Sequence, residues 1–298
     1  MAESLRQTYL DPEILQSLDN MKLRARRLAD GVLAGLHRSP HHGGSVEFSE
    51  YIEYTPGHEL RHIDWNVYGK TDKFYVKQFE DETNLESYLL MDASGSMSFR
   101  GERAPYSKLE YASYLAATLA YVLVTQGDSL GAMGFADTAG TLLPAAARMS
   151  HLDDVFYLLE KLEGEGQTAL DISLQRIAQH ARRRSLVMVF SDFLDADEKT
   201  ANVLRVLRSR QLDVALFHIV DDAELSLPYE GLTIFEGMEG DGDLLVDPDD
   251  IRVRYVEAMK EHCEWLEKTC HRADIGYLRT TTSAPLEEVC QHFLRRRT

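Results

Sequence analysis

Three oxygen-bearing side chains, Asp92, Ser94 and Ser96, stand at alternate positions directly after an apolar run, Tyr88–Met91. The run has the length and composition of a buried strand, and Gly95 allows a tight turn behind it. Such a strand delivers oxygen ligands to its own carboxyl end. Because hard divalent cations such as Mg²⁺ prefer oxygen ligands and keep several waters, one carboxylate and two hydroxyls supply half of a metal site.

Two later segments are predicted to supply the other half. Thr168 follows a glycine-bearing loop and directly precedes a helical pattern, and Asp192 stands just beyond a second apolar run, residues 185–190. In a doubly wound sheet, ligands gather at the carboxyl ends of the strands, so both side chains are expected near Asp92. The local alternative makes Thr168 a helix cap and Asp192 an acceptor for loop amides.

The order of these five residues resembles a known site. An Asp-x-Ser-x-Ser motif, a distant Thr and a more distant strand-end Asp are similar to the metal-ion-dependent adhesion site (MIDAS) of von Willebrand factor A domains. The resemblance implies that Ser94, Ser96 and Thr168 contact a Mg²⁺ or Mn²⁺ ion. It also implies that Asp92 and Asp192 hold the ion largely through water, and that an acidic side chain of a partner protein completes the octahedron.

An upstream segment narrows the resemblance. Residues 53–65 read EYTPGHELRHIDW and residues 75–80 read YVKQFE. Together they resemble the bacterial domain-of-unknown-function 58 family, whose members carry a von Willebrand A-like domain after such a segment. The similarity runs from about Gly43 onward. It implies a metal-dependent adaptor that works with a MoxR-type AAA+ ATPase in the assembly or activation of a client protein complex, and not an enzyme.

Two enzymatic alternatives remain open. The segment His58-Glu59-Leu60-Arg61-His62 matches H-E-x-x-H, in which two histidines bind zinc and the glutamate acts as general base of a metallopeptidase. Against it, Arg61 places a charge between the two ligands, and little helical periodicity follows. The second alternative is a Mg²⁺-dependent phosphohydrolase with Asp92 as nucleophile.

Composition limits the remaining classes. The chain has 298 residues, 44% hydrophobic content and a formal net charge of -17, which argues against nucleic-acid or anionic-membrane partners because both need clustered positive charge. The chain has three cysteines, an odd number, which does not fit the disulfide framework of a small secreted domain. No signal peptide and no apolar run of membrane-spanning length is evident, so we expect a cytoplasmic location.

The order of predicted elements gives the fold. Strands alternate with helices from residue 87 onward, which predicts an α/β domain with a doubly wound, mostly parallel sheet over residues 84–298, preceded by a helical and short-strand extension over residues 1–83. An acidic stretch, residues 221–250, interrupts the alternation with a hairpin of strands 233–235 and 244–246. The other expected strands are 88–91, 129–135, 141–143, 186–190, 214–220 and 275–278; the expected helices are 12–34, 106–126, 150–162, 170–181, 198–210, 249–272 and 285–294.

Overall fold

The structure is a computed structural model that describes residues 12–37, 48–53, 67–69, 74–79, 85–240 and 242–297. Contacts divide the chain into two units. The smaller unit, His37–Asn84, contains strands β1 (Phe48–Glu53) and β2 (Tyr75–Phe79), which pair antiparallel. The larger unit holds everything from Leu85 onward together with the first helix.

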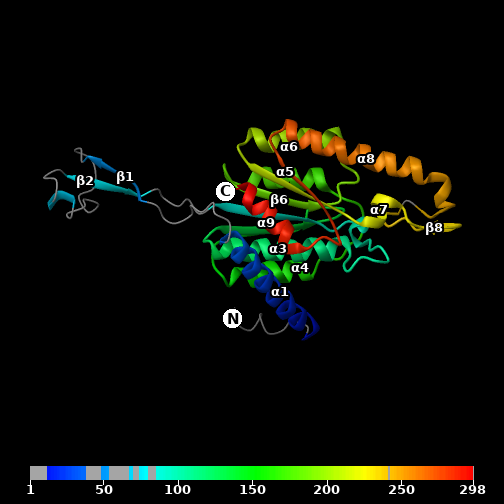
Figure 1. The fold of residues 1–298 in the computed structure, drawn as a ribbon, viewed down its shortest axis with the longest axis horizontal. Helices are drawn as coiled ribbons and strands as arrows, with labels where there is room; N and C mark the ends of the chain where they lie inside the picture. Colours follow the sequence, from blue (N-terminus) through cyan, green and yellow to red (C-terminus); the bar gives the residue numbers. More distant parts are fainter. Residues whose placement is uncertain are drawn as a thin grey trace. The chain divides into compact units, whose positions relative to one another are not determined.

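A six-stranded sheet forms the centre of the larger unit (Figure 1). Its strand order is β10-β7-β6-β3-β4-β5. All neighbouring strands run parallel except β5, which is antiparallel to β4. The central strands are near-continuous apolar runs because both faces of the sheet are covered. The expected doubly wound α/β class is confirmed. The strands are β3 (Glu86–Asp92), β4 (Ser129–Phe135), β5 (Leu143–Ala146), β6 (Leu186–Ser191), β7 (Asp213–Val220) and β10 (Gly276–Thr281).

Helices cover the two faces of this sheet in two groups (Figure 1). One face carries α1 (Pro12–His37), α3 (Lys108–Thr125), α4 (His151–Glu160) and α9 (Leu286–Arg297). The other face carries α5 (Leu170–His180), α6 (Glu198–Ser209) and α8 (Pro248–Arg272). Each group encloses its own apolar cluster, so the sheet separates two halves of the core.

Helix α3 is apolar on almost every side because it lies between the sheet and three other helices. Its start is fixed by a capping box: the Ser107 hydroxyl accepts a hydrogen bond from the Glu110 amide, and the Glu110 carboxylate accepts one from the Ser107 amide. The capping box holds the first residue of the helix, Lys108, at the edge of the sheet where the parallel strands end.

Helix α1 belongs to the larger unit, which differs from the predicted boundary at residue 83. Met21, Ala25, Ala29 and Val32 form a buried stripe at helical spacing and join the apolar cluster of α3 and α9. A Cβ placed on Gly31 would lie 2.6 Å from the Glu287 carboxylate of α9, so the two helices pack closely. The buried stripe therefore joins α1 to the core of the larger unit. The sequence shows the apolar stripe but does not show which helices cover it.

Three smaller elements complete the unit: a 3-10 turn, η2 (Gly95–Ser98), helix α7 (Asp222–Ser226), and the hairpin of β8 (Thr233–Phe235) and β9 (Leu244–Val246). The hairpin strands are those predicted. The predicted edge strand at 141–143 lies instead at Leu143–Ala146, where Leu143 pairs with Ala132 of β4. No helix in the described ranges is long and apolar enough to cross a membrane.

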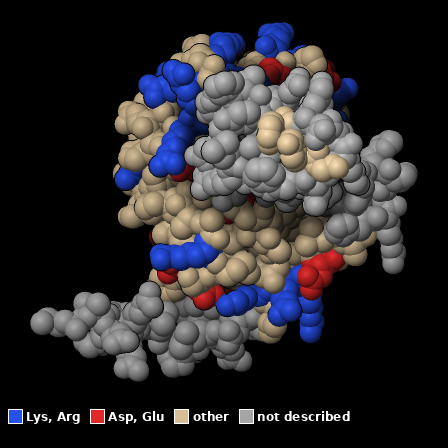
Figure 2. Space-filling view, turned by 90° about the vertical axis from the view of Figure 1, so that its left-hand side faces the viewer, with Lys and Arg blue, Asp and Glu red and all other residues tan. Residues whose placement is uncertain are grey.

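Positive charge concentrates at one edge of the sheet. Exposed arginines precede the amino ends of two central strands, with Arg182, Arg183 and Arg184 before β6 and Arg210 before β7. Figure 2 shows Lys and Arg side chains gathered over part of the molecular surface at this edge of the sheet. The predicted site residues follow the carboxyl ends of the strands, so this positive charge lies at the opposite edge.

Candidate metal centre

The register of β3 and β6 brings the acidic residues of the predicted site together. From β3 the chain continues to β4 on one side, and the later strands β6 and β7 are added on the other side. The strand order therefore reverses between β3 and β6, and doubly wound sheets bind ligands at such a switch point. Met91 pairs with Phe190, so Asp92 lies beside Ser191 at the carboxyl edge. Because successive side chains point to opposite faces, Asp92 and Ser191 share one face, whereas Asp192 turns toward the other. The site therefore spans the end of the sheet.

Asp92 is the hub of the site. Its Oδ2 atom accepts hydrogen bonds from the Thr168 hydroxyl at 3.0 Å and from the Ser191 hydroxyl at 2.6 Å, and its Oδ1 atom accepts one from the Ser94 amide at 2.9 Å. The residue is 1% exposed. One buried carboxylate thus joins the turn after β3, the loop that carries Thr168 and the end of β6.

The serine and threonine hydroxyls are directed into the site and not to helix ends. Thr168 makes no cap for α5, whose N-cap is Ala169, and Ser94 makes no side-chain cap for η2. The Ser94 and Ser96 hydroxyl oxygens lie 3.3 Å apart. The helix-cap alternative for Thr168 is therefore wrong.

Hydrogen bonds join the turn that carries Ser94 and Ser96 to the loop that carries Thr168. The Gly95 amide donates to the Gly166 carbonyl at 2.8 Å, and the Ser98 hydroxyl donates to the Gly164 carbonyl at 2.8 Å. Gly166 adopts φ +75°, in the left-handed region that favours glycine. These bonds hold the turn after β3 against the loop that carries Thr168.

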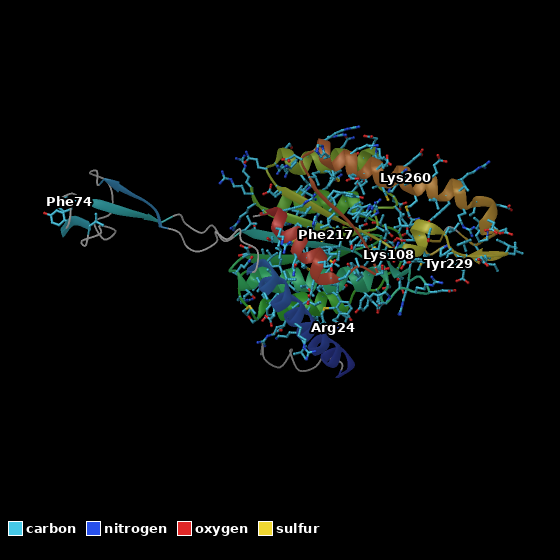
Figure 3. The ribbon with its side chains drawn as sticks, in the orientation of Figure 1. Arg24, Phe74, Lys108, Phe217, Tyr229 and Lys260 are labelled. Atoms are coloured by element: carbon cyan, nitrogen blue, oxygen red, sulfur yellow. The ribbon has the colours of Figure 1, made fainter. Side chains whose placement is uncertain are left out.

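Asp192 is paired with a buried lysine that the sequence did not indicate as part of the site. Lys108, labelled in Figure 3, is 0% exposed, and its Nζ lies 2.7 Å from Asp192 Oδ2 and 2.5 Å from Glu224 Oε1. Burial favours the neutral acid, but the charge of Lys108 and its hydrogen bond outweigh it and lower the pKa of Asp192. Asp192 is thus held ionised, and the Ser96 hydroxyl also lowers its pKa.

Among the residues that the structure describes, no lysine or arginine is paired with Asp92. Burial, and then the negative charge of Asp192, raise its pKa to about 6, while the hydrogen bonds from Ser191 and Ser94 oppose the rise. Ionised Asp92 is therefore unfavourable in the protein alone, and a bound cation would relieve that cost.

This shift predicts a pH dependence of stability in the absence of metal. Because the folded protein holds a proton on Asp92 up to about pH 6 and the unfolded chain releases it near pH 4, stability falls as the pH rises between these values. At about 1.4 kcal/mol per pKa unit, the full loss is about 3 kcal/mol, of which about 2 kcal/mol falls between pH 4.5 and pH 7. Urea unfolding in EDTA at these two pH values should show the loss of about 2 kcal/mol in the wild type and not in Asp92→Asn. The same change in stability with pH in both proteins would contradict the prediction.

All five predicted ligands converge, and three further polar residues join them. Ser191, Lys108 and Glu224 were missed because their role depends on strand register and on α3 and α7 packing at the same edge. One feature of the sequence could have indicated Lys108: it is a cation in the first turn of an apolar helix, where the helix dipole disfavours it. The zinc motif, His58 to His62, lies outside the described residues and stays a prediction.

Comparison with known proteins gives the family. An uncharacterized protein of Mycobacterium tuberculosis, Rv1480, is 26% identical over 283 residues, which cover 93% of this chain and 84% of that protein. Similar solved structures include the conserved hypothetical protein BatB from Bacteroides thetaiotaomicron, at 15% identity and a TM-score of 0.48, covering 71% of this chain and 98% of the other. The SpRpn10 VWA domain matches at 12% identity and a TM-score of 0.41, covering 70% and 94%. No functional statement follows from either structure.

The family model described as "Protein of unknown function DUF58" matches residues 50–265, which include the whole candidate site. The match covers well over half of the chain, and the expected family is confirmed: this protein belongs to the DUF58 family.

Proposed function

We propose that the protein is a Mg²⁺- or Mn²⁺-dependent protein-binding adaptor, and that it has no catalytic activity of its own. The observation that supports the proposal most is the convergence of Asp92, Ser94, Ser96, Thr168 and Asp192 at the carboxyl edge of the sheet. In the described part of the chain, this is the place where three hydroxyl groups and two carboxylates from separate segments meet.

The donor set fits a hard divalent cation. Every side-chain donor is an oxygen, and the number of protein ligands is small, as Mg²⁺ requires. Ser94, Ser96 and Thr168 would supply hydroxyl oxygens, while Asp92 and Asp192 would orient them and balance the charge. When bound, the ion would supply a positive charge at which a carboxylate of a partner protein can dock.

The environment of Asp92 favours this role over that of a nucleophile. Both of its oxygens are engaged by hydrogen bonds and the residue is almost fully buried, whereas a nucleophile needs a free oxygen facing its substrate. The cavity nearby, of about 260 Å³, is lined by Thr168 and Ser191 but not by Asp92.

Thermal unfolding of the metal-stripped protein tests the proposal. A ligand that binds only the folded state at 100 times its Kd stabilises by about 2.7 kcal/mol, which raises the midpoint by about 5–10 °C. We expect Mg²⁺ and Mn²⁺ to raise the midpoint of the wild type but not of Asp92→Ala or Thr168→Ala.

The control is Asp195→Ala, which removes an exposed carboxylate three positions beyond Asp192 and should respond like the wild type. A response to Zn²⁺ alone that Asp92→Ala retains would contradict the proposal and move attention to His58, Glu59 and His62. Catalytic release of phosphate from simple esters, lost in Asp92→Asn, would support the phosphohydrolase instead.

The partner and the location are part of the proposal. The DUF58 resemblance suggests a MoxR-type AAA+ ATPase as partner and a client protein that supplies the acidic side chain, all in the cytoplasm. Mixing the purified protein with a purified ATPase of this type, with and without Mg²⁺, should give a complex in the first condition. Asp92→Ala should abolish the increase in client binding that Mg²⁺ causes and leave the binding measured without Mg²⁺ unchanged.

A further inference from the structure

The hairpin of β8 and β9 reaches the candidate metal centre from the acidic stretch of the chain. Its connecting loop lies against the turn that carries Ser94 and Ser96. A Cβ placed on Gly95 would lie 2.1 Å from the Met238 carbonyl oxygen, so glycine is needed at Gly95 to let the hairpin loop approach this closely. Two segments far apart in sequence are therefore in direct backbone contact at the site.

The same loop brings a carboxylate to the site. The Ser96 amide donates a hydrogen bond to Glu239 Oε1 at 3.2 Å, across 143 positions of sequence. Ser96 is one of the proposed hydroxyl ligands, so the Glu239 carboxylate stands beside the cation position without belonging to the five predicted residues. It is an acidic side chain of the kind that a partner protein is proposed to supply.

Glu239 brings a further carboxylate to the turn after β3, whose Ser94 amide is already bound by Asp92. Lys108, the cation at this edge of the sheet, is engaged by Asp192 and Glu224. A divalent cation among the hydroxyls would attract the Glu239 carboxylate.

We propose that Glu239 is an internal acidic ligand of the metal centre, held at the position that a partner's carboxylate takes over. The inference rests on the proposed function, since it needs a cation at the site. Binding of a partner then becomes an exchange of one carboxylate for another, and the hairpin competes with the partner for the ion.

The hairpin is built so that such an exchange costs little. In the described part of the chain, its two strands pair only with each other. Apolar side chains along it, Leu232, Ile234, Leu244 and Leu245, are between 58% and 72% exposed. Because little apolar surface is buried by the hairpin, moving its loop away from Gly95 loses little hydrophobic stabilisation.

Titration of the metal-stripped protein with Mn²⁺ alone, followed by water-proton relaxation, tests the inference. The measurement reports both affinity and the number of waters on the bound ion. We expect Glu239→Gln to raise the Kd for Mn²⁺ about tenfold. We also expect it to increase the relaxation per bound ion, because a water replaces the lost carboxylate.

The matched control is Glu236→Gln, which removes the same charge from an exposed position of the same hairpin and should match the wild type. If Glu239→Gln equals the wild type while Asp92→Ala no longer binds Mn²⁺, the role of Glu239 is wrong and the metal centre stands. An equal effect of Glu236→Gln would also overturn it, since the effect would then be one of general charge. If Asp92→Ala binds Mn²⁺ as the wild type does, the proposed metal centre is wrong and the inference falls with it.

Discussion

Lys108→Met is expected to lower the free energy of unfolding by about 3–5 kcal/mol, because it leaves one buried and one partly buried carboxylate without their cation. Lys108 is 0% exposed, and it pairs with both Asp192 and Glu224. Methionine keeps the length and packing of the side chain, so the loss reports the charge and not a cavity. Urea unfolding at pH 7.5, compared with the wild type, measures it.

The effect of Lys108→Met should shrink in acid. In the wild type the pKa of Asp192 is lowered, so its ionised form contributes stability that is lost as the pH falls through that pKa. Burial already raises the pKa of Glu224 in the wild type, and without Lys108 it raises the pKa of Asp192 as well, so that protonation relieves the variant first. The difference from the wild type should therefore be smaller at pH 5 than at pH 7.5.

Two variants serve as controls for the Lys108 prediction. Lys161→Met removes an exposed lysine and should change stability by less than about 0.5 kcal/mol. The double variant Lys108→Met/Glu224→Gln removes one of the orphaned charges and should recover part of the loss. A loss below about 1 kcal/mol with no dependence on pH would mean that the ion pair is not a structural part of the site.

Val32→Asp is expected to cost about 3 kcal/mol or more, because it places an unpaired carboxylate in the core shared by α1, α3 and α9. Leu23→Asp is the matched control, since Leu23 is 54% exposed on the same helix and its replacement should be nearly neutral. Thermal unfolding of both variants, followed by near-ultraviolet circular dichroism, compares them.

The α1 prediction separates two descriptions of the N-terminal region. If α1 were part of an independent extension, Val32→Asp would leave the transition of the larger unit unchanged. The buried stripe of α1 and the close approach of Gly31 to Glu287 favour one cooperative unit instead. A single shifted transition is therefore expected, and an unchanged main transition would contradict the packing.

Local patterns in the sequence were sufficient to predict most of the fold. The apolar runs that became β3, β6 and β7 and the long apolar helix α3 lie within a few residues of their expected bounds, because length and hydrophobicity alone specify buried parallel strands and a central helix. The edge strand β5 was displaced, since an edge strand has one partner and a weak pattern. The position of α1 was missed because an apolar stripe on a helix does not show which part of the protein packs against it.

The site divides in the same way. Asp92, Ser94 and Ser96 follow one strand and could be found from its end, and Thr168 and Asp192 from the rule that ligands gather at the carboxyl edge. Ser191 could be assigned to the site only from the pairing of Met91 with Phe190. Lys108 could be assigned only once the start of α3 was placed at that edge of the sheet. Glu239 could be assigned only from the fold of a hairpin far along the chain. Tertiary placement, and not residue type, assigns these three.

Helix α1 and strand β3 lie in the same unit, so residues 37–84 are an insertion within one domain. The insertion has two covalent tethers, one from α1 and one into β3, the strand that ends at Asp92. One proteolytic cut in either tether would open the chain without releasing the insertion. After such a cut α1 would stay bound by its packing alone, so the nicked protein should keep its two fragments together until it unfolds.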